Sequence, residues 1–317
     1  MLEMALRQAV ELGSYERAAR NFSALTNVSI SASSLQRLVL AYGTEVVRAD
    51  EEEAEAMVRV PAEEEGVTWR RIPEPDSEVM VASADGVMVH LRNEGWKEAK
   101  VASVSAAPVG EAGAQAEGEL RLEKHSYRAG LWDAKRFTNH YWAENYRRGV
   151  EKAKQVVCIN DGAIWIWMMV FVCFPRRIEI LDWWHMLQYV WQIAAAAFGP
   201  DSAKAAAWVD AQKAALARSQ LRLFFRRILR LYPLLSQAPP EVKKAVAYLW
   251  KNRRRMNYAA YRKAGFPISS GTVESAAKTL IQQRMKQAGM RWSRDGAQAM
   301  LALRARLLSE RWHEIPI

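Results

Sequence analysis

The stretch from Val156 to His185 constrains the fold of this 317-residue chain more than any other. Two short apolar runs within it, Val156–Ile159 and Arg177–Leu181, have the composition of buried strands. The first run leads into Asp161 and the second into Asp182. A carboxylate at the tip of a buried strand is costly unless it is paired or binds a cation. Two consecutive strands ending in this way predict an open α/β sheet with its site at the carboxyl ends of the strands.

Each aspartate also has a purely structural interpretation, which these residues alone leave open. Asp161 could cap the helix that follows it, and Asp182 could pair with a nearby arginine.

The charge distribution points to a polyanionic partner. The chain has a formal net charge of +10, yet residues 201–317 carry 23 Lys and Arg against 7 Asp and Glu. A basic C-terminal part predicts nucleic-acid binding. Cys158 and Cys173 lie in apolar runs and indicate buried thiols in a reducing compartment. The longest apolar stretch, 163–174, is too short to cross a bilayer, so we expect a cytoplasmic, nucleoid-associated protein with no membrane partner.

Composition divides the chain into five segments. We expect a helical, helix-turn-helix-like segment over 1–60 and an acidic, proline-containing linker over 61–77. The catalytic core is expected in two parts, 78–185 and 265–317, separated by an all-helical basic insertion over 186–264.

The N-terminal pattern predicts a helix from Tyr15 to about Leu25, a turn, and a helix from Ser34 to Tyr42 that Gly43 ends. Any small helical hairpin would have the same pattern. Further on, residues 78–91 predict a strand with a bulge or a close ligand approach at Asp85-Gly86, followed by a hairpin turn over 95–100.

Arginine clusters mark the predicted insertion. Arg226, Arg227 and Arg230 lie on one expected helix, and Arg253, Arg254 and Arg255 lie on another, expected over 242–261. Such clusters are usually solvated helix faces, but nearly uncompensated ones favour phosphate contacts.

Three carboxylates together suggest a reaction. Asp85 lies on a strand, Asp161 at the end of another, and Glu274 in the first turn of a helix that follows the insertion. This is the layout of two-metal phosphoryl-transfer enzymes with a ribonuclease H-like fold, in which carboxylates from separate elements hold two Mg²⁺ ions. Glu274 alone could equally be a capping-box residue.

Several stretches resemble the ISKra-type insertion-sequence transposases, a branch of the DDE (Asp-Asp-Glu) transposases near the Mutator-like group. They are ADGVMVHLRNEGWKEAKV, NDGAIWIW, FPRRIEILDWWHMLQYVW, PISSGTVESAAKTLIQQRMKQAGMRW and LRARLLSERW, between Ser83 and Trp312. The resemblance implies an α/β, ribonuclease H-like mixed sheet flanked by helices.

The resemblance also implies roles for single residues. Asp85, Asp161 and Glu274 would be the catalytic carboxylates and ligands of two Mg²⁺ ions, with Mn²⁺ as a substitute. Asp182 and His185 would form an accessory motif, although Asp182 could instead be the second metal ligand. Near the third carboxylate, the residues expected to hold the scissile DNA end are Arg284, Lys286, Arg291 and Trp292.

The expected function is therefore a DNA transposase that cleaves element ends and joins them to target DNA, acting as a dimer or larger assembly on paired ends. Two alternatives remain: an inactive or repurposed DNA-binding derivative, and a structure-specific nuclease of the same fold. Members of the family extend further at the N-terminus, so we expect a shortened copy.

Overall fold

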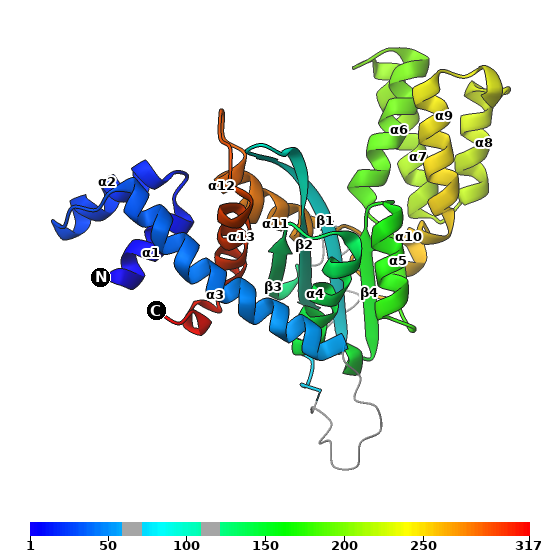
Figure 1. Cartoon of the computed structure of the whole chain (residues 1–317). Helices are drawn as coiled ribbons and strands as arrows, with labels where there is room; N and C mark the ends of the chain where they lie inside the picture. The colour runs from blue at the N-terminus through cyan, green and yellow to red at the C-terminus, as the bar shows by residue number, and fades with distance from the viewer. Residues whose placement is uncertain (59–71, 109–120) are drawn as a thin grey trace.

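A five-stranded mixed sheet forms the centre of the molecule (Figure 1). The computed structural model describes residues 1–58, 72–108 and 121–317, so most of the expected linker lies outside the described residues. The strand order is β3-β2-β1-β4-β5, with β1, β4 and β5 parallel and β2 antiparallel to both of its neighbours. The strands are β1 (Val79–Leu91), β2 (Gly95–Ala107), β3 (Glu123–Gly130), β4 (Gln155–Asn160) and β5 (Ile178–Leu181).

The β1–β2 hairpin is longer and more regular than the sequence predicted. Its turn is formed by residues 92–94, not by 95–100, because Asn93 and Gly95 take the positive φ angles (64° and 71°) that a tight turn requires. The predicted bulge at Asp85-Gly86 is wrong, since β1 pairs with β2 without interruption from Val79 to Leu91. The missing side chain of Gly86 instead makes room for Glu98 of β2.

The N-terminal helices pack onto the rest of the chain. They are α1 (Leu2–Glu11), α2 (Tyr15–Thr26) and α3 (Ala32–Val58). The prediction that Gly43 ends the third helix is wrong. Gly43 lies inside α3, where a Cβ atom would come within 2.5 Å of the Ala299 Cβ of α13 (Arg294–Leu308). Glycine is therefore needed there for close packing of two helices, rather than as a helix terminator.

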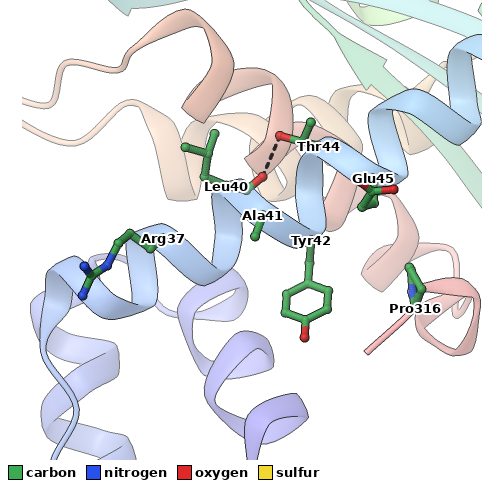
Figure 2. A pocket seen from close by; sticks show the side chains of 7 residues that line it. All are labelled: Arg37, Leu40, Ala41, Tyr42, Thr44, Glu45 and Pro316. Carbon is green, nitrogen blue, oxygen red and sulfur yellow. Dashed lines mark hydrogen bonds between the residues drawn. The ribbon is translucent and has the colours of Figure 1, made fainter.

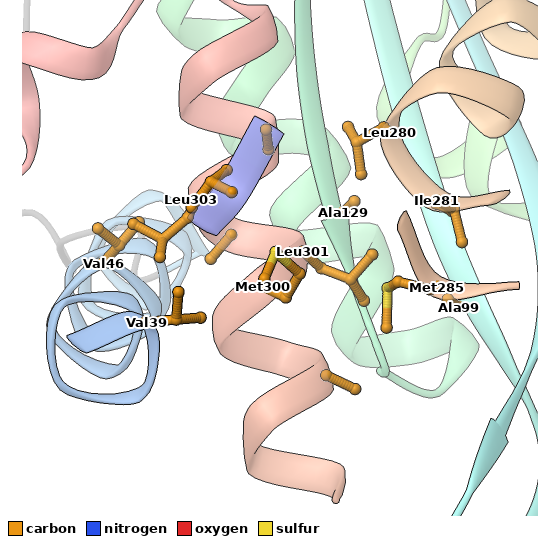
Figure 3. Close-up of a cluster of buried hydrophobic side chains, with 14 of the residues drawn as sticks. Val39, Val46, Ala99, Ala129, Leu280, Ile281, Met285, Met300, Leu301 and Leu303 are labelled. Carbon is orange, nitrogen blue, oxygen red and sulfur yellow. The ribbon is translucent and has the colours of Figure 1, made fainter. Parts of the chain in front are cut away.

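One hydrophobic core joins both ends of the chain. Figure 3 shows Val39 and Val46 of α3 facing Leu303 of α13, with Leu280 and Ile281 on the far side of that helix. The same cluster includes buried residues of α1, α2 and the β1–β2 hairpin. The N-terminal helices are therefore part of the core that covers one face of the sheet.

The other face of the sheet carries α4 (Ala134–Arg147) and α5 (Ile164–Cys173). The basic helix expected over 132–154 ends earlier, because Gly149 adopts a left-handed conformation (φ 64°) and a short 3₁₀ turn, Val150–Lys152, follows.

The expected all-helical insertion is a bundle of five helices that stands beside β5 (Figure 1). We call residues 183–263 the helical module. Its helices are α6 (Trp183–Phe198), α7 (Ala203–Ala217), α8 (Leu221–Leu231), α9 (Pro240–Asn252) and α10 (Tyr258–Lys263). The single helix predicted over 242–261 is wrong. A 3₁₀ turn, Arg253–Arg255, separates α9 from α10 where Arg255 turns back to bind Glu179 of β5.

The chain returns to the sheet through α11 (Gly271–Ala276), a π-helical turn (Ala277–Gln282) and α12 (Gln283–Met285). Among the residues described, none of the helices combines the length and apolar character that crossing a bilayer requires.

Candidate functional site

The strand register places three aspartates level with one another at one edge of the sheet. The parallel β1–β4 pairing runs from Val79↔Gln155 to Ala82↔Cys158. Asp85 and Asp161 each lie three residues beyond the last of these pairs. The β4–β5 pairing ends at Asn160↔Leu181, so Asp161 and Asp182 are the next residues on those two strands. Carboxylates therefore follow corresponding positions of three neighbouring parallel strands, as the sequence predicted.

Asn160 holds this edge together where the backbone ladder stops. Its side chain is fully buried, and its Oδ1 accepts a hydrogen bond from the Ala84 backbone N–H at 2.7 Å. Its backbone carbonyl accepts from the Asp182 N–H at 2.9 Å. A side-chain amide thus replaces a ladder bond between β1 and β4 and fixes the residues next to both Asp85 and Asp161.

Strand alternation puts Asp85 and Asp161 on the same face of the sheet. Val81 and Val87 point to the side covered by the module and by the terminal helices, and Asp85 shares their parity along β1. Val157 and Ile159 do the same for Asp161. α11 also packs against this region of β1 and β2, so Glu274 approaches from the same side.

Asp182 links the start of the helical module to the helix that carries Glu274. Its Oδ1 accepts from the His185 N–H at 2.6 Å, which caps α6. Its Oδ2 accepts from the Ser270 N–H at 2.5 Å and from the Ser270 Oγ at 2.8 Å. Ser270 in turn accepts from the Glu274 N–H at 3.1 Å. Both oxygens of this buried carboxylate are engaged, so the geometry favours a positioning role over the alternative role of second metal ligand.

The three predicted catalytic carboxylates influence one another electrostatically. Burial raises the pKa of Asp85 to about 7, and the negative charges of Asp161, Glu274 and Glu98 add to this rise, while the Gly86 N–H opposes it. Burial and Asp182 raise the pKa of Glu274, against the nearby positive charges of Lys278 and His185. No Lys or Arg in the described part of the chain forms an ion pair with Asp85, Asp161 or Glu274. The group is therefore an uncompensated negative site.

These carboxylates are within electrostatic range but do not form a closed coordination shell. Over residues 1–58, 72–108 and 121–317, no three His, Cys, Asp or Glu side chains lie close enough together to hold one metal ion. By donor chemistry, the oxygen ligands of Asp85, Asp161 and Glu274 suit a hard divalent cation such as Mg²⁺. A cation would also relieve the repulsion that raises the Asp85 pKa.

The predicted DNA-contacting residues separate into three groups. Five are exposed: Arg226, Arg230, Arg254, Lys286 and Arg291.

Three others are engaged within the helical module. Arg227 donates to the Ala211 carbonyl, which ties α8 to α7. Arg253 donates to the Trp250 carbonyl at 2.7 Å, and its guanidinium lies over the Trp250 ring. Arg255 pairs with Glu179 at 2.6 Å.

Arg284 and Trp292 lie in the interior, at 1% and 6% exposure. The Arg284 guanidinium lies between the rings of Tyr15 and Trp292, 4.5 and 5.0 Å from their centroids, and donates to the Ala9 carbonyl. Trp292 donates through its backbone N–H to His90 at the end of β1. In this structure both residues serve packing, and neither reaches a surface where DNA could lie.

Sequence reasoning missed three residues beside the carboxylates. Glu98 lies across from Gly86 and pairs with Lys100 at 2.7 Å. Tyr189 and Tyr248 of the module stack on each other beside Asp161, whose charge contributes to the rise of both phenol pKa values above burial alone. The β1–β2 register could have indicated Glu98, whereas no local signal marks a tyrosine inside a helix.

A separate open pocket lies over α3. Figure 2 shows Arg37, Tyr42 and Glu45 of that helix at its edge, with Pro316 of the C-terminal segment across from them. None of the residues predicted from the sequence to act in catalysis or DNA binding lines this pocket.

Neither a scan of protein-family models nor a search of curated proteins produced a match to this chain.

Proposed function

We propose that this chain is a DNA transposase of the DDE type with a ribonuclease H-like catalytic core. The observation that carries the proposal is the level placement of Asp85 and Asp161 on adjacent parallel strands, on the face that Glu274 approaches. The strand order, with an antiparallel hairpin added to a parallel unit, and the helical module between β5 and α11 support it.

In this proposal, Asp85, Asp161 and Glu274 would hold two Mg²⁺ ions, which supply Lewis-acid chemistry for attack at phosphorus when bound. The chain itself supplies positioning. Asn160 sets the distance between the first two carboxylates, and the Asp182–Ser270 hydrogen bonds set the orientation of α11. His185 lies close enough to Glu274 for its positive charge to lower the Glu274 pKa, so protonated His185 would favour the ionised carboxylate.

Double-stranded DNA is the partner that the charge distribution favours. The exposed arginines Arg226, Arg230 and Arg254 belong to the helical module, and Lys286 and Arg291 flank the loop after α12. Phosphate contacts from these groups would hold the element ends and the target DNA. The resemblance to ISKra-type transposases adds the expectation of a dimer or larger assembly on paired ends.

The test is cleavage and joining of a labelled duplex that carries the ends of the encoding element, in the presence of Mg²⁺. We expect wild-type activity, and a loss of about a hundredfold or more with Asp161→Asn while DNA binding survives, because one metal ligand is weakened. Asp210→Asn, a matched change at an exposed site on α7, should leave activity unchanged.

Other outcomes would decide between the alternatives. DNA binding without cleavage by the wild type would identify a repurposed DNA-binding derivative. Hydrolysis without joining would identify a nuclease.

A further inference from the structure

The helical module touches the turn after β4 through one hydroxyl group. The Gly162 N–H donates to the Tyr248 Oη at 2.9 Å. The approach leaves no space, since a Cβ atom on Gly162 would overlap the Tyr248 ring and come within 2.6 Å of the Asn252 Nδ2. Glycine at this position therefore allows α9 to press directly on the residue that follows Asp161.

The Tyr248 ring is itself held in place from several sides. Tyr189 of α6 stacks on it with centroids 3.8 Å apart and planes 20° from parallel. The His185 ring lies 5.9 Å from it. One turn further along α9, Asn252 accepts from Arg255 at 3.0 Å, and Arg255 is anchored to Glu179 of β5. The hydroxyl is thus fixed relative to both the module and the sheet.

The turn has few other restraints. Asp161 accepts through Oδ1 from the Ala163 N–H at 2.9 Å, which leaves Oδ2 free of protein donors among the described residues. After accepting from Gly162, the Tyr248 hydroxyl still has its own hydrogen to donate. Burial and the charge of Asp161 raise the Tyr248 pKa, so the phenol stays protonated near neutral pH.

We infer that Tyr248 is a positioning residue for Asp161, through which the helical module sets the second carboxylate in its metal-binding orientation. The inference rests on the proposed function, in which Asp161 is a metal ligand. Hydrogen-bonding partners outside the metal ligands typically change metal affinity by about 10- to 100-fold. Movement of the module away from β4 would release the turn and weaken the site.

The test compares the wild type with Tyr248→Phe, which keeps the ring stack and removes the hydroxyl. Tyr232→Phe is the control, because the Tyr232 hydroxyl of the same module has no hydrogen-bond partner among the described residues. Two measurements are made on the full chain. The first is amide hydrogen exchange at Gly162 in metal-free buffer. The second is Mn²⁺ binding, followed by the electron paramagnetic resonance signal of the free ion.

For Tyr248→Phe we expect exchange at Gly162 to accelerate about tenfold or more and Mn²⁺ affinity to fall about tenfold or more. Tyr232→Phe should match the wild type in both measurements. Gly162→Ala, which forces the ring away, should reproduce the Tyr248→Phe result in Mn²⁺ binding.

Unchanged exchange at Gly162 in Tyr248→Phe would overturn the inference, and so would faster exchange with unchanged Mn²⁺ affinity. If the wild type binds no Mn²⁺ while Tyr248→Phe still accelerates exchange, the hydroxyl holds the turn as inferred and the proposed metal site is the part that fails.

Discussion

At the scale of single residues, His140 gives the clearest dependence on pH. Its ring is fully buried, stacks on Trp132 at 3.7 Å, and lies 3.1 Å from a carboxylate oxygen of Glu51. Burial lowers the His140 pKa to about 4, despite the opposing attraction of Glu51. The native state therefore keeps His140 neutral at pH values where the unfolded chain already protonates it.

Linkage gives the sign of the effect. Between about pH 6.5 and pH 4 the unfolded state binds more protons at this group, so the free energy of unfolding falls as the pH falls. The loss from this group is up to about 3 kcal/mol. Urea unfolding at pH 7 and pH 5 should show it in the wild type and not in His140→Gln. The exposed His313→Gln should behave as the wild type, and an equal pH dependence in all three proteins would contradict the assignment to His140.

The sequence placed Asp85, Asp161 and Glu274 correctly at the level of elements, because strand ends and helix starts are local features. It assigned Arg284 and Trp292 to a surface because an arginine is usually exposed. The groups that receive Arg284 are the Ala9 carbonyl and the Tyr15 ring, more than 260 residues earlier in the chain. No local pattern encodes such a long-range contact, so burial of an arginine could not be predicted.

At the scale of elements, the contact between α3 and α13 predicts an unusual effect of alanine. In most helix interiors Gly→Ala is stabilising by roughly 0.5–1 kcal/mol. At Gly43 the added Cβ would lie 2.5 Å from the Ala299 Cβ and 2.8 Å from its backbone. We expect Gly43→Ala to destabilise the protein by about 1–3 kcal/mol, measured by urea denaturation.

Thr44→Ala is the matched control for this prediction, since Thr44 is the exposed neighbour on the same helix and its change should stay within about 0.5 kcal/mol. A stabilised Gly43→Ala protein would show that α3 and α13 are not packed as closely as described.

Helix positions followed from the sequence, but several helix ends did not. Gly43 was interpreted as a terminator because glycine commonly follows a helix, whereas here it serves packing. The break at Arg253–Arg255 depends on the pairing of Arg255 with Glu179, which lies in a different element. In both cases a tertiary contact overrode the local preference.

At the scale of the whole molecule, the exposed arginines of the helical module predict the salt dependence of DNA binding. Replacing Arg226, Arg230 and Arg254 together with Gln should weaken binding to all duplex sequences and flatten the plot of log affinity against log salt by up to about three phosphate contacts. Fluorescence anisotropy with duplexes of two unrelated sequences, at several salt concentrations, measures both effects.

The exposed Arg17 and Arg20 of α2 supply the control, because their replacement removes positive charge far from the module in the sequence. An unchanged slope in the triple module variant, or a larger change in the α2 variant, would contradict the assignment of the module as the main phosphate-binding surface.

The two ends of the chain meet inside the folded protein, and this has a consequence for its biosynthesis. Asp50 of α3 binds Arg306 of α13 across 256 residues, and the apolar face of α3 is covered by α13. On the ribosome, α1–α3 emerge first and α13 nearly last. The nascent chain therefore exposes an apolar helical surface for almost its entire synthesis, so it should depend on chaperones until the final helix is released.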